Sequence, residues 1–341
     1  MLINFNNNIG GLRMKKKIII GALFITGLFF IFASKNTLNV RPEANDQLNS
    51  IGQNNEIVDE GINKYDEKTV EEIPILMYHH ISKDPSSWNS IIISPEKFEE
   101  DMLYLKAMGY NTIHFKEYVA YKEKGGELPE KPIIITLDDG YESNFLYAYP
   151  LLKELNMKAT ISVIGNLIGL KQETGLSYLD WEQMKEMYDS GVIEIQHHSY
   201  SLHQPGEGTY KGGAMPMTVE SPDEYRERFT KDTLKLKNEI EKILGNEVIV
   251  YTYPYGFYNE KTEEILKELG FKFSLTVEEG LGQIANGYAL KRINVPSSMP
   301  SIKLIKTLQK LQGKKEKIIF QGVKDQGERI EKLRQELSYD S

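Results

Sequence analysis

From residue 73 onward, short apolar runs alternate with amphipathic stretches along the chain. Each run is bounded by polar residues, glycine or proline, a pattern that indicates a buried β-strand. The expected strands are residues 73–78, 111–114, 133–137, 159–164, 192–196, 248–252, 271–275 and 289–293.

The stretches between these runs carry helix start signals. Ser94 and Ser221 each precede a proline, the combination of a capping residue with proline at the first helical position. Asp180 with Gln183 three residues later forms a capping box, and another helix is expected at about 259–269. Strands that alternate with helices predict an α/β fold, here an irregular (β/α) barrel of seven or eight parallel strands with outer helices.

The first 72 residues lack this alternation of apolar runs and amphipathic stretches. A basic cluster, Arg13 and Lys15 to Lys17, precedes an uncharged and mainly apolar run at 18–33. This pattern is typical of a signal peptide or a retained signal anchor, and the sequence leaves both open. We therefore expect a signal segment at 1–35, a flexible polar spacer at 36–72, a catalytic domain at 73–312 and a charged tail at 313–341. The protein would be secreted or held at the outer face of the membrane.

Composition and charge exclude several kinds of site and argue against a nucleic-acid partner. The 341 residues include no cysteine, which excludes disulfides, thiolate metal sites and a lipid-modified cysteine. The net charge of the whole chain is −8. Residues 1–35 contain lysine and arginine but no acidic residue, so the remainder of the chain carries a larger net negative charge. Phosphate binding needs basic patches, so a nucleic-acid partner is not expected.

Residues that could catalyse a reaction or bind a metal come directly after the expected strands, where barrels of this kind place their active sites. Asp138 and Asp139 come directly after the run 133–137 and precede Gly140. An Asp-Asp-Gly sequence is also a common turn. Two adjacent carboxylates repel each other, however, and a cation between them would explain why both are present.

Histidines give the second signal, since five of the six follow two expected strands: His79, His80, His197, His198 and His203. His198 and His203 are five residues apart, which is about 140° on a helix and opposite faces on a strand. They can meet at one ion only if the chain between them is irregular. One carboxylate with two imidazoles suits Zn²⁺, Fe²⁺, Co²⁺ or Ni²⁺ and leaves coordination positions open for catalysis.

Three motifs, in order, resemble those of polysaccharide deacetylases with a NodB-homology domain, carbohydrate esterase family four. They are TLDDG at 136–140, HSYSLH at 198–203 and YPYG at 253–256, and the resemblance covers roughly 73–300. The five-residue histidine spacing and the pair Tyr78-His79 are similar to the branch that deacetylates poly-N-acetylglucosamine in biofilm matrices.

The resemblance implies a metal-dependent hydrolase that cleaves the carbon–nitrogen bond of N-acetyl groups on a polysaccharide. Asp139, His198 and His203 would bind the divalent metal, with zinc favoured and cobalt, nickel or iron still open. The polysaccharide would be the substrate, and the membrane would be a partner only if the N-terminal segment is retained.

The same resemblance assigns the catalytic roles. Asp138 would be the general base, His79 the general acid, and the backbone N–H of Tyr255 would help to hold the oxyanion. The wider family carries Arg-x-Pro in its third motif, but that arginine position is Thr252 here. Arg292, in the last expected strand, is the candidate to orient the base instead.

Other interpretations remain open at this point. The same residues would serve a deacetylase of peptidoglycan or of xylan esters. Two less favoured alternatives are a domain that binds glycan without catalysis and a metal-free domain in which the aspartates and histidines are turn residues. The sequence does not choose the polymer, the metal or the oligomeric state.

Overall fold

The computed structural model describes residues 70–173, 176–207, 210–314, 324–325 and 327–328. The expected signal segment at 1–35, nearly all of the spacer and most of the tail lie outside the described residues. Within the described part of the chain, no helix is both long enough and apolar enough to cross a membrane.

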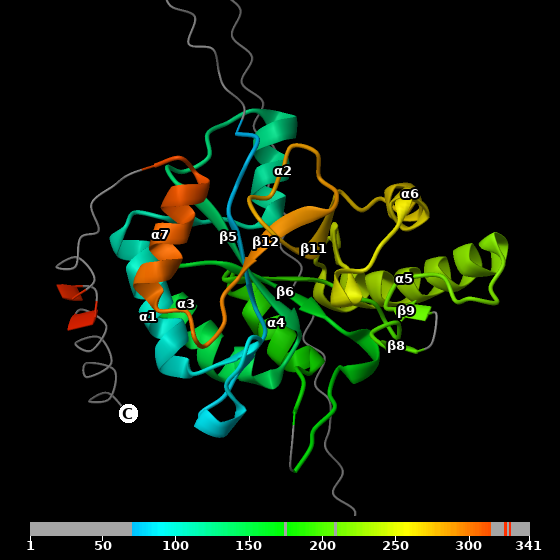
Figure 1. The fold of residues 1–341 in the computed structure, drawn as a ribbon, viewed down its shortest axis with the longest axis horizontal. Coiled ribbons are helices and arrows are strands. Elements are labelled where there is room, and N and C mark those ends of the chain that lie inside the picture. Colours follow the sequence, from blue (N-terminus) through cyan, green and yellow to red (C-terminus); the bar gives the residue numbers. More distant parts are fainter. Residues whose placement is uncertain (1–69, 174–175, 208–209, 315–323, 326, 329–341) are drawn as a thin grey trace, which may run out of the picture. The chain divides into compact units, whose positions relative to one another are not determined.

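Seven parallel strands form a closed barrel (Figure 1), which confirms the fold expected from the sequence. The order is β1-β12-β11-β10-β7-β6-β5, and pairing of β1 with β5 closes the ring. The one expected strand outside this ring is the run at 111–114, which forms β4 and pairs with β5 only. The bounds are β1 Ile75–Tyr78, β4 Asn111–Thr112, β5 Pro132–Asp139, β6 Ala159–Val163, β7 Ile193–His197, β10 Val250–Thr252, β11 Phe273–Glu279 and β12 Leu290–Asn294.

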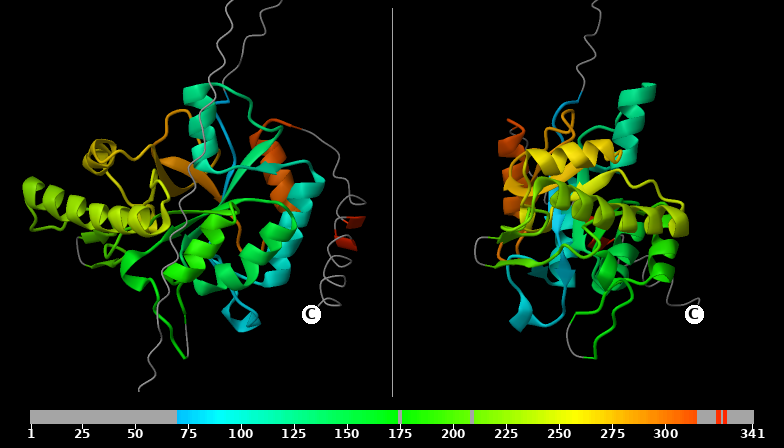
Figure 2. Two further views of the ribbon diagram at one scale, coloured as in Figure 1. Left: turned by 180° about the vertical axis from the view of Figure 1, so that it is seen from behind. Right: turned by 90° about the vertical axis from the view of Figure 1, so that its right-hand side faces the viewer.

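Helices surround the barrel, and α7 lies beside α1 in both figures that show the whole fold (Figures 1 and 2). The helices are α1 Pro95–Ala107, α2 Phe115–Lys124, α3 Tyr149–Glu154, α4 Trp181–Asp189, α5 Pro222–Leu244, α6 Glu260–Glu268 and α7 Ser301–Leu311. Ser94, Asp180 and Ser221 cap α1, α4 and α5 as the sequence predicts. Short helical turns are η1 Pro85–Ser87, η2 Asn144–Ala148, η3 Gly165–Leu167 and η4 Pro254–Gly256.

Two small strand pairs lie outside the barrel and were not expected. β2 (His80–Ile81) pairs with β3 (Ile92–Ile93), and β8 (Pro205–Glu207) forms a hairpin with β9 (Tyr210–Gly212). These strands are too short to show a hydrophobic period in the sequence.

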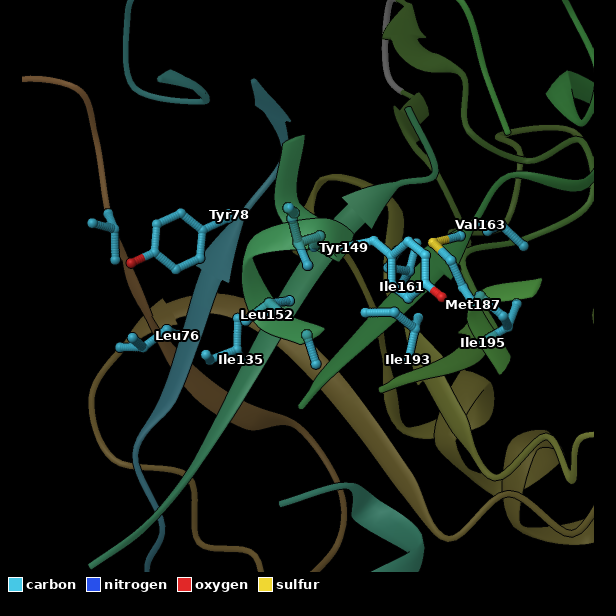
Figure 3. Close-up of a cluster of buried hydrophobic side chains, with 14 of the residues drawn as sticks. Leu76, Tyr78, Ile135, Tyr149, Leu152, Ile161, Val163, Met187, Ile193 and Ile195 are labelled. Atoms are coloured by element: carbon cyan, nitrogen blue, oxygen red, sulfur yellow. The ribbon is translucent and has the colours of Figure 1, made fainter. Parts of the chain in front are cut away.

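Strand β5 shows how the core positions the site. Ile133, Ile135 and Leu137 belong to the large apolar cluster between barrel and helices, part of which is drawn in Figure 3. Ile134 belongs to a second cluster, and since side chains alternate along a strand it points the other way, into the barrel. Further along the same inner face the barrel becomes polar. The candidate site residues Asp138 and Asp139 therefore lie at the carboxyl end of this strand.

Candidate active site

Asp139, His198 and His203 meet at the carboxyl end of the barrel. A carboxylate oxygen of Asp139 lies 3.3 Å from Nε2 of His198 and 3.4 Å from Nε2 of His203. The ligand atoms of all three residues lie within 4.8 Å of one another. The structure therefore brings the three expected metal ligands together, from the end of β5 and from the segment after β7.

Irregular backbone makes this meeting possible. Ser199, directly after His198, has a left-handed φ of 71°, so the chain leaves the strand direction before it reaches His203. Asp139 and Gly140 also have positive φ values, 75° and 77°. A Cβ on Gly140 would lie 2.9 Å from the side chain of Val163, so a larger residue does not fit there.

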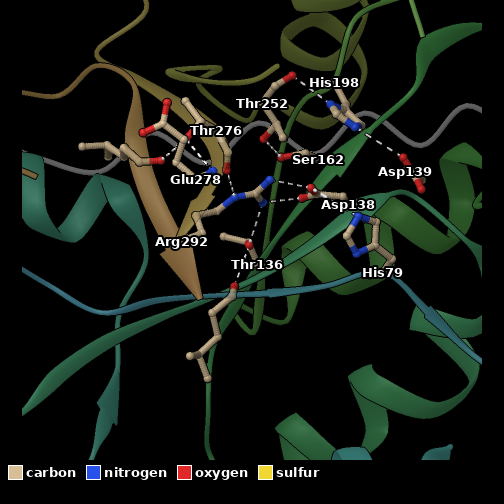
Figure 4. A network of polar contacts seen from close by, with 12 residues as sticks. His79, Thr136, Asp138, Asp139, Ser162, His198, Thr252, Thr276, Glu278 and Arg292 are labelled. Atoms are coloured by element: carbon tan, nitrogen blue, oxygen red, sulfur yellow. Dashed lines mark hydrogen bonds and ion pairs between the residues drawn. The ribbon is translucent and has the colours of Figure 1, made fainter. Parts of the chain in front are cut away.

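The surroundings of the three side chains favour a cation. His198 donates from Nδ1 to the carbonyl oxygen of Thr252 at 2.8 Å, which turns Nε2 toward Asp139 (Figure 4). Burial alone would raise the pKa of Asp139, but His198 holds it below its usual range. Burial lowers the pKa of His203 to about 4, so its imidazole is neutral and can donate a lone pair. This N, N, O donor set, with Asp139 and His198 buried and His203 half-buried, fits a divalent transition metal.

Beside these ligands, Arg292 binds both oxygens of Asp138, at 2.8 and 2.7 Å (Figure 4). Arg292 is fully buried and also donates to the Thr136 hydroxyl and to the Thr276 carbonyl. Burial raises the pKa of Asp138, but the charge and hydrogen bonds of Arg292 outweigh it, and the pKa falls below its ordinary value. Asp138 is therefore held as an oriented carboxylate.

His79 lies on the other side of Asp138. Its Nε2 is 3.8 Å from Oδ2 of Asp138, and its side chain is only 13% exposed. Burial lowers the pKa of His79, and the negative charges of Asp138 and Asp139 oppose that shift. Its Nδ1 makes no hydrogen bond within the described part of the chain. His79 thus presents a titratable nitrogen next to the candidate base.

Tyr255 forms one wall of the site. It sits in η4 with a left-handed φ of 57°, and its ring centroid is 4.6 Å from that of His203. A cavity of about 400 Å³ is lined by apolar side chains such as Met77 and Val277 and by six of the candidate site residues: His79, Asp138, Asp139, His198, His203 and Tyr255. The role of the Tyr255 N–H stays a prediction.

Two of the five clustered histidines do not face this cavity. His197 donates from Nε2 to the carbonyl of Thr233, and its ring stacks on Tyr251. His80 binds the hydroxyl of Ser143 through Nδ1. Clustering in the sequence therefore overstated the number of histidines in the site, because side chains on one strand alternate between its two faces.

Sequence reasoning also missed partners that hold the site residues. The Thr252 carbonyl is a backbone group and leaves no trace in the residue type. Asp232, on α5, accepts hydrogen bonds from the segment between His198 and His203. Among the many charged residues of that helix, nothing in the sequence distinguishes it.

Comparison with known proteins agrees with this geometry. A family model described as polysaccharide deacetylase matches residues 125–274. YxkH of Bacillus subtilis, a polysaccharide deacetylase by name, is 35% identical over 228 residues, 67% of this chain and 72% of that protein. The poly-beta-1,6-N-acetyl-D-glucosamine N-deacetylase of Staphylococcus epidermidis is 28% identical over 60% of this chain and 68% of its own. The Escherichia coli K12 protein of the same name is 23% identical, and the matched region spans only 37% of it.

Solved structures give the same result. Streptococcus pyogenes deacetylase PplD, in complex with acetate, has 30% identity and a TM-score of 0.56, covering 69% of this chain and 97% of that one. IcaB from Ammonifex degensii has 27% identity and a TM-score of 0.59, covering 70% and 97%. These findings confirm the family resemblance seen in the three motifs.

Proposed function

The chain belongs to the polysaccharide deacetylase family, and on that premise we propose that it is a divalent-metal-dependent hydrolase that removes N-acetyl groups from an extracellular amino-sugar polymer. A polymer of the poly-N-acetylglucosamine type is the proposed substrate, supported by the relatives and by IcaB. The observation that carries the proposal is the meeting of Asp139, His198 and His203 beside the clasped carboxylate of Asp138.

Asp139, His198 and His203 would hold the metal, and the donor set fits zinc, with cobalt, nickel or iron as alternatives. When bound, the ion supplies a Lewis acid that makes water a nucleophile near neutral pH and polarises the acetyl carbonyl. All three residues are buried or half-buried, which limits competition from solvent.

The remaining residues move protons and stabilise charge. Asp138 takes a proton from the water that attacks the acetyl carbonyl carbon, and Arg292 keeps that carboxylate ionised and oriented. The backbone N–H of Tyr255 donates to the oxygen that becomes negatively charged. Protonated His79 donates to the amide nitrogen as the C–N bond breaks, so acetate and a free amine leave.

The place of action follows from the N-terminal pattern. The basic cluster and the apolar run at 18–33 support export, with the domain either released or retained at the membrane. The membrane is then a partner only in the retained form.

The test is release of acetate by the full chain after chelation and stepwise return of Zn²⁺, Co²⁺, Ni²⁺ or Fe²⁺. The substrates are a β-1,6-linked N-acetylglucosamine oligomer, its β-1,4-linked counterpart and acetylated xylan. Metal-dependent release from the β-1,6 oligomer that disappears in Asp138→Asn supports the proposal. Asp189→Asn, at an exposed carboxylate on α4, is the matched control and should keep full activity.

Each other result changes the conclusion. Preference for the β-1,4 oligomer or for xylan would replace the substrate class. Tight metal binding without release from any of the three would favour a glycan-binding role.

A further inference from the structure

The segment 199–202, which we name the ligand loop, joins His198 to His203 and is held by a carboxylate outside the catalytic cavity. Asp232 on α5 accepts a hydrogen bond from the backbone N–H of Tyr200 and another from that of Ser201, both at 2.8 Å. It also accepts from the Ser201 hydroxyl at 2.8 Å. Asp232 is only 8% exposed, so water competes little for these bonds.

The opposite edge of the ligand loop is fixed by backbone groups. Gly165 donates to the Ser199 carbonyl at 3.0 Å, and Asn166 donates to the Tyr200 carbonyl at 2.8 Å. A Cβ on Gly165 would lie 2.4 Å from the ring of Tyr200, so the two segments are already in close contact. On this edge the loop has no freedom to shift inward.

The side that faces α5 is different, because a cavity of about 930 Å³ lies there. Tyr200, Ser201 and Leu202 line it together with Asp232. On this side the backbone of the ligand loop is held by the three hydrogen bonds to Asp232, while side-chain contacts are made by Leu202, which packs in the apolar core, and by Tyr200, whose ring centroid lies 3.6 Å from Nζ of Lys235. The next residue of α5, Thr233, accepts from His197 and so fixes the chain just before His198.

We propose that Asp232 is a positioning residue that fixes His203 relative to His198 and Asp139 and thereby sets the affinity of the site for a divalent metal. The inference rests on the proposed function, since it concerns the metal that this function requires. Without the carboxylate, two backbone N–H groups lose their acceptor, and the loop can move toward the cavity. His203 moves with it, because it directly follows the loop.

The experiment measures metal affinity of the full chain by competition with a chelator, and records the visible absorption spectrum of the Co²⁺ form. Asp232→Ala should weaken affinity by about 10- to 100-fold, the range for residues that orient metal ligands, and should alter the Co²⁺ spectrum. Asp232→Asn keeps one acceptor oxygen and should lie between wild type and Asp232→Ala. It also serves if Asp232→Ala does not fold.

Ser221→Ala is the matched control, because Ser221 caps the same helix but does not touch the ligand loop. It should lower the melting temperature and leave affinity and spectrum unchanged. If wild type binds metal and both Asp232 variants bind it within twofold of wild type, the inference is wrong and the proposed function stands. If wild type binds no metal, the metal requirement of the proposed function is wrong, and the inference falls with it.

Discussion

Inside the barrel, the guanidinium of Arg292 donates one hydrogen bond to each carboxylate oxygen of Asp138, at 2.8 and 2.7 Å. The side chains are 0% and 2% exposed. Each charge therefore depends on the other, since a buried ion without its partner is costly. One contact links the stability of the barrel to the protonation and orientation of the candidate base.

Replacement of Arg292 should therefore affect both properties. Arg292→Met leaves Asp138 buried without its counter-ion, and we expect a loss of about 3–5 kcal/mol in the free energy of unfolding. Arg292→Lys keeps the charge but not the two-pronged geometry, so it should retain more stability. For both variants we expect acetate release to fall at least about 100-fold, since the base loses its orientation.

Denaturant unfolding and acetate release, measured on the same preparations, check this prediction. Arg228→Lys is the control, because Arg228 binds Glu220 in a similar way away from the catalytic cavity. Wild-type activity in Arg292→Lys would show that the base does not need the pair of hydrogen bonds from Arg292 to orient it.

Glu194 predicts a pH dependence of stability. It is 1% exposed inside the barrel, and burial raises its pKa from an ordinary 4.5 to about 7, against a smaller opposing effect of Lys116. A raised folded-state pKa means that the protonated form is favoured on folding. This stabilisation is fully present below pH 4.5 and is lost as the pH rises through 7, a change on the order of 3 kcal/mol.

Glu194→Gln should remove this dependence. The amide oxygen can still accept from the Phe115 N–H, as the carboxyl group does at 3.1 Å. Unfolding free energies at pH 5 and pH 8 should therefore differ less in the variant than in wild type, and the variant should be more stable at pH 8. Glu186→Gln, at an exposed site on α4, is the control. Parallel curves for Glu194→Gln and wild type would contradict the assignment.

Much of the fold could be predicted because buried parallel strands can be recognised in the sequence as apolar runs. Strand β5 reads as one such run and ends in Asp138 and Asp139, so its place in a barrel and its chemistry were both visible. The direction of each histidine was not visible. His197 and His198 are neighbours in sequence, yet one packs against Tyr251 and the other faces Asp139.

The features that could not be predicted depend on contacts between residues far apart in the sequence. Arg292 could be suggested as a substitute for the missing family arginine, but its two bonds to Asp138 depend on β12 and β5 lying in one closed barrel. Asp232 carried no signal, because its function depends on where α5 passes the ligand loop. Such pairings join residues far apart in sequence, and no local pattern encodes them.

Metal binding should stabilise the fold measurably. An ion that binds only the folded chain adds about 2.7 kcal/mol when its free concentration is 100 times Kd. Zn²⁺ should therefore raise the melting temperature of the chelated protein, and addition of a chelator should reverse the rise. In Asp139→Asn the shift should be lost, because the central carboxylate contacts both imidazoles. A full shift in Asp139→Asn would place the metal elsewhere.

The role of His79 can be separated from metal binding by changing the leaving group. If His79 protonates the departing amine, His79→Gln should reduce acetate release from an N-acetylated oligomer by about 10²–10⁴-fold. With 4-nitrophenyl acetate the loss should be much smaller, because a nitrophenolate leaves without a proton. Metal affinity should stay unchanged, since the His79 contact is to Asp138 and not to the ligand set. His80→Gln, whose ring binds Ser143, is the neighbouring control. Equal losses on both substrates would show that His79 positions the substrate rather than donating a proton.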